Sequence, residues 1–261
     1  MIKIFLTKLS SIKLAYQPLT RTLLLAAMAV VMSLSFSIRA AHANVSLMVL
    51  GDSLSAGYGL SQADSWVSEI ARDWQANHPH LEIINASISG ETTAGGLNRL
   101  PDLLERHQPS MVFIELGGND GLRGFNLTTM ENNLREMVAL IESRNIKVAL
   151  SEVEIPPNLG RRYTEMFKQV FHDVAEDMDI PLVPFFMREI AIDESLMQND
   201  GIHPNLAAQP IIATIMEPQL RQLLEKEVLA EQASSGQTQF KQAKPTYLQT
   251  EFRQHKTGIS Q

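Results

Sequence analysis

Short apolar runs alternate along the chain with longer segments in which apolar residues recur at helical spacing. The five runs are rich in aliphatic and β-branched residues and span Ser46–Leu50, Leu81–Asn85, Met111–Leu116, Ile146–Glu152 and Pro181–Pro184. Their shortness favours strands that are buried in a parallel sheet. We therefore predict five parallel strands.

Helical periodicity fills the segments between these runs. In Ser65–His78, Ser65 can cap a helix and large apolar side chains recur every four residues on one face. Segment Thr129–Arg144 carries a similar stripe of Met130, Leu134, Met137, Val138 and Ile141. Strands that alternate with helices predict right-handed crossovers and a three-layer α/β/α sandwich. Because ligands bind beyond the carboxyl ends of the strands in such sheets, chemistry is expected in the turns that follow the strands.

The N-terminal 43 residues differ in composition from the rest of the chain. They contain basic but no acidic residues, and the apolar run Leu23–Phe36 precedes Ala41-His42-Ala43. This order is typical of a secretory signal peptide, and the run is shorter than the roughly 20 residues of a membrane-spanning helix. We predict a signal peptide over residues 1–43, cleaved after Ala43. An uncleaved membrane anchor is the alternative.

The C-terminal segment 230–261 is rich in Gln, Ser, Thr and Lys and has no apolar period. This composition favours a polar, disordered tail. A partner-binding peptide anchored by Phe240, Tyr247 and Phe252 is the alternative. The remaining residues, 44–229, are long enough for one domain with a sizeable core.

Charge and cysteine content exclude several classes of function. Without the five basic residues of the leader, the chain has 17 Lys and Arg against 29 Asp and Glu, a formal charge of −12. A nucleic-acid partner is not expected, because phosphate binding needs clustered Lys and Arg. The sequence contains no Cys, which excludes disulfides, a thiol nucleophile and a thiolate metal site.

Two glycine-containing turns follow the first two predicted strands. In Gly51-Asp52-Ser53, the glycine could allow a sharp bend that displays Ser53 as a nucleophile near a helix start, where free N–H groups favour negative charge. The same residues also make an ordinary turn and helix cap. In the second turn, Gly90 could offer an unobstructed main-chain N–H to a substrate oxygen, or could serve only the turn.

Polar side chains occur after the third strand and in a loop late in the chain. Asn119 could donate its amide N–H to an oxyanion, or could form an Asx turn. Asp200 and His203 are three residues apart in DGIHPN, so the carboxylate could fix the tautomer of the imidazole and support its cation.

Each of these four signals is modest, but together they supply a nucleophile, two oxyanion donors, a base and an orienting acid. The histidines His107 and His172 lie on predicted helices away from this edge. Because a two-histidine site would need further ligands, no metal is expected.

The four turns resemble the four sequence blocks of the GDSL, or SGNH, hydrolases, which centre on Ser, Gly, Asn and His. The matching blocks are GDSLS with Ser53, SISGETT with Gly90, GGNDGLRG with Asn119 and DGIHPN with His203, and the likeness spans residues 45–225. The resemblance implies a five-stranded flavodoxin-like sheet and a triad of Ser53, His203 and Asp200. It also implies an oxyanion hole formed by the main-chain N–H groups of Ser53 and Gly90 with the Asn119 side chain.

Longer phrases around these blocks resemble those of periplasmic family members that act on acyl-CoA thioesters and lysophospholipids. This implies hydrolysis of esters and thioesters through an acyl-enzyme on Ser53, without a cofactor. The loop Glu154–Tyr163 resembles a segment that closes over bound acyl chains, and the acidic Glu152 and Glu154 could alter headgroup preference. The residues that either line an apolar groove or simply pack are Leu60, Leu122, Phe125, Ile155 and Leu159.

Two alternatives stay open. One is a carbohydrate acetylesterase on the same fold, and the other is a secreted lipid- or peptide-binding domain without turnover, since a fold does not dictate a function. The intact Ser53, Asp200 and His203 argue against the second. We expect a periplasmic or secreted monomer whose partner is a small acyl ester or thioester, with no stable membrane insertion of the mature chain.

Overall fold

The structure is a computed structural model that describes residues 45–242, with side chains through Lys226. The chain divides into two units, Met1–Asn44 and Val45–Gln261, and the fold belongs to the second. The predicted signal peptide and residues 243–261 lie outside the described residues. Within the described part, helices that combine the length and hydropathy needed to cross a bilayer are absent.

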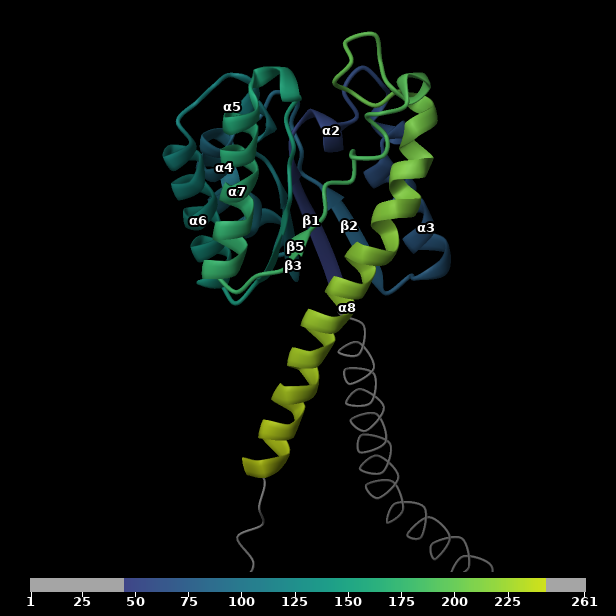
Figure 1. Ribbon diagram of the computed structural model, residues 1–261. Helices are drawn as coiled ribbons and strands as arrows, with labels where there is room; N and C mark the ends of the chain where they lie inside the picture. The colour runs from purple at the N-terminus through teal and green to yellow at the C-terminus, as the bar shows by residue number, and fades with distance from the viewer. Residues whose placement is uncertain (1–44, 243–261) are drawn as a thin grey trace, which may run out of the picture. The chain divides into compact units, whose positions relative to one another are not determined.

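A five-stranded, all-parallel sheet forms the centre of this unit, in the order β2-β1-β3-β4-β5 (Figure 1). Each strand overlaps one predicted run, and the predicted α/β/α sandwich with a flavodoxin-like strand order is confirmed. The strand order reverses between β1 and β3, and ligands bind at such switch points in open α/β sheets. The strands are β1 (Val45–Gly51), β2 (Leu81–Asn85), β3 (Met111–Glu115), β4 (Lys147–Ser151) and β5 (Leu182–Val183).

Helices connect successive strands. The longer ones are α3 (Trp66–Asn77), α4 (Thr93–His107), α6 (Leu127–Glu142), α7 (Arg161–Asp177) and α8 (Gln209–Gln242). The short ones are α2 (Ser53–Ala56), α5 (Gly118–Leu122) and the 3-10 turns η1 (Gln62–Asp64), η2 (Pro157–Leu159), η3 (Glu194–Leu196) and η4 (Leu206–Ala208). As predicted, the Ser65 side chain caps α3 by accepting from the Ser68 N–H, and α3 buries Trp66, Ile70 and Trp74.

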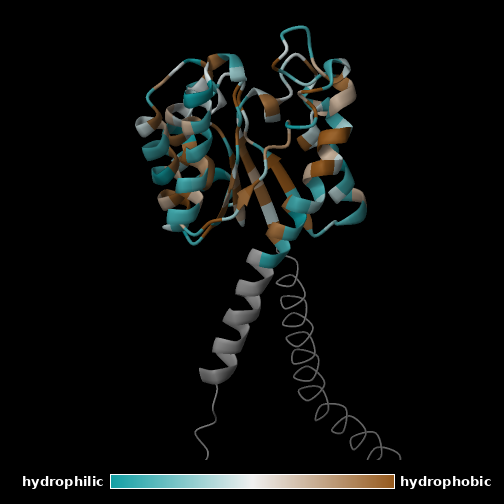
Figure 2. Cartoon of the chain, viewed as in Figure 1, coloured by the Kyte–Doolittle hydropathy of each residue, from teal (hydrophilic) through white to brown (hydrophobic). Residues whose placement is uncertain are grey.

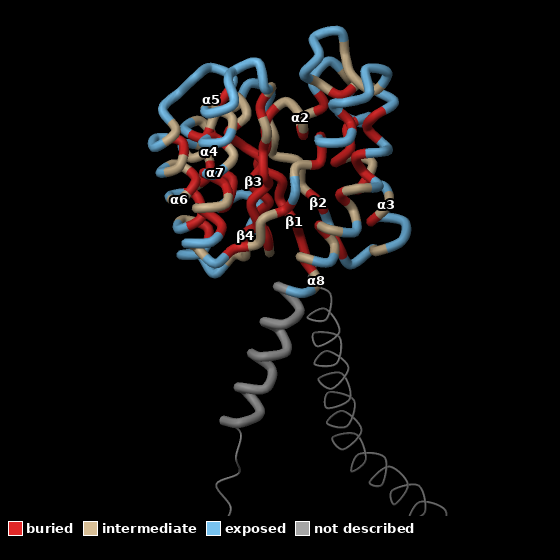
Figure 3. The backbone as a smooth tube through the Cα atoms, viewed as in Figure 1, coloured by how far each residue is buried: buried red, intermediate tan, exposed pale blue. Residues whose placement is uncertain are grey.

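The sheet has an apolar core on each face because successive strand residues point to opposite sides. Leu47 and Val49 of β1 pack in the cluster that includes α3 and α8, whereas Met48 and Leu50 pack in the cluster that includes α4, α6 and α7. Figures 2 and 3 show hydrophobic, buried strands between helices whose outer faces are polar and exposed. The predicted apolar stripe of α6 is buried against the second face.

The C-terminal helix differs from the prediction of a polar tail that begins at Ala230. Helix α8 continues to Gln242 and so overlaps the first part of that segment. The prediction relied on an apolar period, but Ala, Glu, Gln and Lys favour helix by intrinsic propensity even without an apolar face.

Candidate active site

The turn after β1 is shaped by a glycine and an aspartate. A Cβ atom at Gly51 would lie 2.8 Å from both Glu115 Oε2 and Ser87 Oγ, so a larger residue would force the turn apart. The Asp52 side chain then caps α2 by accepting from the Leu54 N–H at 3.0 Å. Ser53 is therefore the first residue of α2, at the carboxyl edge of the sheet and beside the switch point.

The structure brings Ser53, His203 and Asp200 together, although Ser53 and His203 are 150 residues apart in the sequence. His203 Nε2 lies 2.8 Å from Ser53 Oγ, and His203 Nδ1 lies 2.7 Å from Asp200 Oδ2. Because a carboxylate accepts the Nδ1 proton, Nε2 is left to accept the hydroxyl proton of Ser53.

Asp200 is held as a carboxylate by its hydrogen bonds. Its Oδ1 accepts from the main-chain N–H groups of Ile202 and His203, both at 3.0 Å. Burial alone would raise the pKa of Asp200, but the hydrogen bonds from His203 and Ile202 outweigh it and lower the pKa to about 2. The carboxyl is therefore ionised at neutral pH and can stabilise a protonated imidazole.

The Arg123 guanidinium joins Gly90 and Asn119, which are two of the three predicted oxyanion donors. Arg123 Nη2 donates to the Gly90 carbonyl at 3.1 Å and approaches Asn119 Oδ1 at 3.5 Å. Asn119 Nδ2 donates to Asp52 Oδ2 at 3.0 Å, and its second N–H is left for another acceptor. Gly90 has φ +80°, a conformation that L side chains rarely adopt, so glycine suits this position.

Two buried acids beneath the nucleophile turn were not among the predicted site residues. Burial raises the pKa of Asp52 to about 6, against the hydrogen bonds from Leu54 and Asn119. Burial also raises the pKa of Glu115 well above its usual value, and Ser55 Oγ donates to Glu115 Oε2 at 2.7 Å. A sequence signal existed only for Asp52, which lies inside the first block.

The predicted groove residues lie in different environments. Leu122, Phe125 and Leu159 are exposed and Leu60 is half-buried. Ile155 is instead a core residue that packs close to Gly121. For Ile155 the structure therefore favours the packing alternative over the groove.

The acidic residues beside the loop after β4 belong to an ionic cluster. Glu152 is buried and contacts Lys168, His172 and Arg188, while Glu154 contacts Lys168 and Arg188. Burial opposes ionisation of Glu152, but hydrogen bonds from these three partners outweigh it and lower its pKa to about 2. Both carboxylates are thus paired with cations.

His172 lies closer to the carboxyl edge than we predicted. It is on helix α7 as expected, but its Nε2 is 3.0 Å from Glu152 Oε1, and Glu152 directly follows β4. His107 ends helix α4. The helical periodicity of the sequence placed His172 on its helix correctly. It could not show that this side of the helix packs at the carboxyl end of β4.

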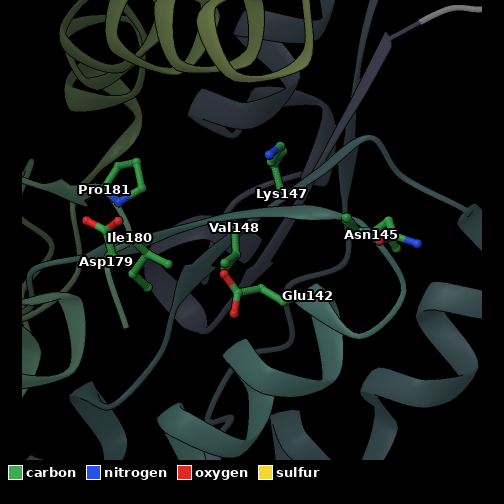
Figure 4. A pocket seen from close by; sticks show the side chains of 8 residues that line it. Glu142, Asn145, Lys147, Val148, Asp179, Ile180 and Pro181 are labelled. Carbon is green, nitrogen blue, oxygen red and sulfur yellow. The ribbon is translucent and has the colours of Figure 1, made fainter. Parts of the chain in front are cut away.

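A cavity of about 260 Å³ lies at the opposite edge of the sheet, before the amino ends of β4 and β5 (Figure 4). None of the predicted site residues lines it. Since chemistry in this fold class lies beyond the carboxyl ends, the cavity is not part of the candidate site. Its lining residues are Glu142, Asn145, Ile146, Lys147, Val148, Asp179, Ile180 and Pro181.

One surface group within the described residues has the side-chain types of a metal site. Asp73, His78 and Glu217 bring one potential ligand atom each within 4.8 Å of one another. The Glu217 carboxylate already accepts from Trp74 Nε1 at 3.1 Å and Arg221 Nε at 2.8 Å. The group lies on α8 and at the C-terminal end of α3, outside the four predicted turns.

Comparison with known proteins gives concordant matches. The model of the GDSL-like lipase/acylhydrolase family matches residues 49–210. Thioesterase 1/protease 1/lysophospholipase L1 of Escherichia coli strain K12 is 46% identical over 186 residues, which cover 71% of this chain and 88% of the relative. An arylesterase of Vibrio mimicus is 42% identical over 181 residues, covering 69% and 90% respectively.

A solved structure agrees with these sequence matches. The psychrotrophic esterase EstA of Pseudoalteromonas sp., inhibited by monoethylphosphonate, superposes with a TM-score of 0.67 at 46% identity. The match covers 69% of this chain and 98% of EstA. The family model, the relatives and the strand order all agree, and the chain belongs to the GDSL-like lipase/acylhydrolase family.

Proposed function

We propose that the chain is a secreted serine hydrolase that cleaves carboxylic ester and thioester bonds of acyl substrates through an acyl-enzyme on Ser53. The hydrogen-bonded series Asp200–His203–Ser53 carries this proposal, because it supplies a nucleophile, a base and an orienting acid in one chain of contacts. The names of the relatives support acyl thioesters, lysophospholipids and aryl esters as the substrates to test.

In the first step, His203 Nε2 takes the hydroxyl proton as Ser53 Oγ attacks the substrate carbonyl carbon. The ionised Asp200 beside Nδ1 stabilises the imidazolium that forms. His203 then gives the proton to the departing alcohol or thiol, and the acyl group stays on Ser53. Attack by a water molecule, activated in the same way, releases the acid and restores the serine.

The developing oxyanion is stabilised by the main-chain N–H groups of Ser53 and Gly90 and by the second N–H of Asn119. Asn119 is oriented for this role from both sides, since Asp52 accepts from its nitrogen and Arg123 approaches its oxygen. A pre-oriented donor adds transition-state stabilisation without reorganisation during the reaction.

The decisive experiment combines labelling of the nucleophile with its removal. A p-nitrophenyl alkylphosphonate should release nitrophenol and modify the purified protein once, on the peptide that contains Ser53. Ser53→Ala should abolish labelling and lower ester turnover at least about a thousandfold, while the melting temperature stays unchanged. Labelling elsewhere, or full activity of Ser53→Ala, would remove Ser53 as the nucleophile.

A substrate panel decides the class of acyl substrate. We expect long-chain acyl-CoA thioesters, lysophospholipids and short-chain aryl esters to be hydrolysed faster than acetylated sugars. Faster release of acetate from sugars would favour the carbohydrate acetylesterase instead. No hydrolysis of any of them, with phosphonate labelling also absent, would favour a lipid-binding domain.

The proposal of secretion rests on the leader-like composition of residues 1–43. Export of the full-length chain from a bacterial host should yield a periplasmic protein whose N-terminal residue is Asn44. Recovery of protein that retains residues 1–43 in the membrane fraction would contradict it.

A further inference from the structure

The ring of Tyr58 lies against the imidazole of His203. The two ring centroids are 4.3 Å apart with an interplanar angle of 35°. Tyr58 directly follows α2 and its glycine cap, and the residue is 48% exposed. Within the described residues, its hydroxyl makes no hydrogen bond, so the ring face is the contact that matters.

Gln198 connects the Tyr58 segment to the loop that carries His203. Its Nε2 donates to the carbonyl of Tyr58 at 2.7 Å and to the carbonyl of Pro204 at 3.0 Å. Its main-chain N–H donates to the carbonyl of His203 at 2.8 Å. One side chain therefore joins the segment after the nucleophile to the segment after the base.

A glycine makes this close approach possible. A Cβ atom at Gly59 would lie 2.6 Å from Gln198 Oε1, and Gly59 has φ +74°, where L side chains are strained. The segment next to Tyr58 is thus shaped to receive the Gln198 amide.

The loop that carries His203 has little core packing of its own. Residues 199–202 are exposed, and a Cβ atom at Gly201 would meet open space. The position of the imidazole relative to Ser53 therefore depends on a few hydrogen bonds and on the Tyr58 ring. A displacement of about 1 Å in a catalytic group can cost on the order of a hundredfold in rate.

We propose that Gln198 and Tyr58 are positioning residues for His203. Gln198 fixes the loop to the segment after the nucleophile, and the Tyr58 ring covers one face of the imidazole so that Nε2 stays directed at Ser53 Oγ. This inference rests on the proposed function, in which His203 is the base. Since neither side chain hydrogen-bonds to Ser53 Oγ or to His203 Nε2 in the described structure, both should affect turnover more than substrate binding.

The first test replaces Gln198 by Leu, which keeps much of the side-chain volume and removes the donor. We expect kcat for a short-chain aryl ester to fall about tenfold to a hundredfold with KM within about twofold, because the base is displaced while the binding surface is kept. The rate of phosphonate inactivation should fall by the same factor, since it depends on the same serine and imidazole. Gln219→Leu is the matched control, because Gln219 Nε2 also donates to a main-chain carbonyl, that of Ile215 at 2.8 Å, but within α8.

The second test changes the exposed ring and does not depend on the folding of the Gln198 variant. Tyr58→Leu should lower kcat severalfold, and Tyr58→Phe should restore most of that loss because the stacked face is kept. If Gln198 acts through Tyr58, the effects of the two substitutions are not independent. The fold-loss in kcat of the double variant Gln198→Leu/Tyr58→Leu should then be smaller than the product of the fold-losses of the two single variants. A proton resonance of the His203 Nδ1–H, expected far downfield in the wild type, should weaken or shift in Gln198→Leu.

Three outcomes overturn the proposal. The first is a folded Gln198→Leu variant with an unchanged kcat. The second is a Tyr58→Leu variant in which KM rises and kcat does not fall, and the third is a Tyr58→Phe variant whose kcat is as low as that of Tyr58→Leu. The second would make Tyr58 a substrate-binding residue. Failure of the proposed function is recognised separately, because then Ser53 would not be labelled by phosphonate in the wild-type protein.

Discussion

The carboxyl edge of the sheet carries two carboxylate–histidine pairs of similar geometry. Asp200 and His203 lie 2.7 Å apart in the loop before η4, and Glu152 and His172 lie 3.0 Å apart where β4 meets α7. In both pairs the pKa of the carboxyl is lowered to about 2 by hydrogen bonds that outweigh burial. Residue types and distance alone do not separate them.

The partners of each pair are what differ. His203 has Ser53 Oγ at 2.8 Å on its other nitrogen, and Asp200 serves only His203 and a neighbouring N–H. Glu152 is shared among His172, Lys168 and Arg188, and these contacts tie β4 and α7 to the segment after β5. A carboxylate–histidine pair therefore gives chemistry only when the free imidazole nitrogen meets a nucleophile, and otherwise it is one contact in an ionic cluster.

The largest contrast should appear when each histidine is removed. His203→Ala should lower kcat/KM for a short-chain aryl ester at least about a thousandfold, because the base is lost. His172→Ala should change it less than twofold. Comparable losses in both variants, at matched melting temperatures, would show that the Glu152 pair also takes part in the reaction.

The next effect concerns Asn119, whose N–H is aimed at an oxygen that becomes charged only in the transition state. Asn119→Ala should lower kcat by about 10² to 10³ and leave KM nearly unchanged. Steady-state kinetics and a thermal melt on the same sample check this. A loss of thermal stability with kcat changed less than tenfold would mean that Asn119 only braces its turn.

Removing the Glu152 carboxylate should lower the stability of the protein without changing its activity. Glu152→Gln should lower the free energy of unfolding by about 1 kcal/mol at pH 7, because the buried Glu152 carboxylate loses its ion pairs with the partly exposed Lys168 and Arg188. The folded-state pKa of Glu152 lies below its ordinary value of 4.5, so its contribution is complete above about pH 4.5 and is lost as the pH falls towards 2. Denaturant melts should show the two proteins converging over that range, with ester turnover at pH 7 unchanged within about twofold. If the difference in unfolding free energy between the two proteins did not narrow over that range, the Glu152 ion pairs would not contribute to stability.

The smallest effect concerns Asp52, the buried acid under the nucleophile, whose contribution to stability should change with pH in the opposite direction to that of Glu152. Burial raises the pKa of Asp52 from 3.8 to about 6, so between these pH values the folded protein binds a proton that the unfolded chain has released. The contribution of Asp52 to stability should therefore fall as the pH rises from about 4 to 6, and remain lower above that range. Asp52→Asn should remove this downward component from a plot of unfolding free energy against pH. An identical slope for wild type and variant would mean that Asp52 has an ordinary pKa in the folded protein.

Local patterns in the sequence determined the elements of this fold. The five apolar runs became the five strands, and the stripes beginning at Trp66 and Met130 became the buried faces of α3 and α6. These predictions depend on side-chain period and capping, which act over a few residues. Residues Ser53, Asp200 and His203 were also predicted from the four sequence blocks, and the structure places them in contact.

Only the tertiary structure decided which of the remaining polar residues meet. The pKa shifts of Asp52 and Glu115 arise chiefly from burial, which depends on how the chain folds. Their hydrogen-bond partners Asn119 and Ser55 lie 67 and 60 residues away in the sequence. The same holds for Glu152, whose cations come from α7 and from the segment after β5, and for Gln198, which lies 140 residues from Tyr58. Strand order and helix packing set these contacts, and no periodicity within a short segment encodes them.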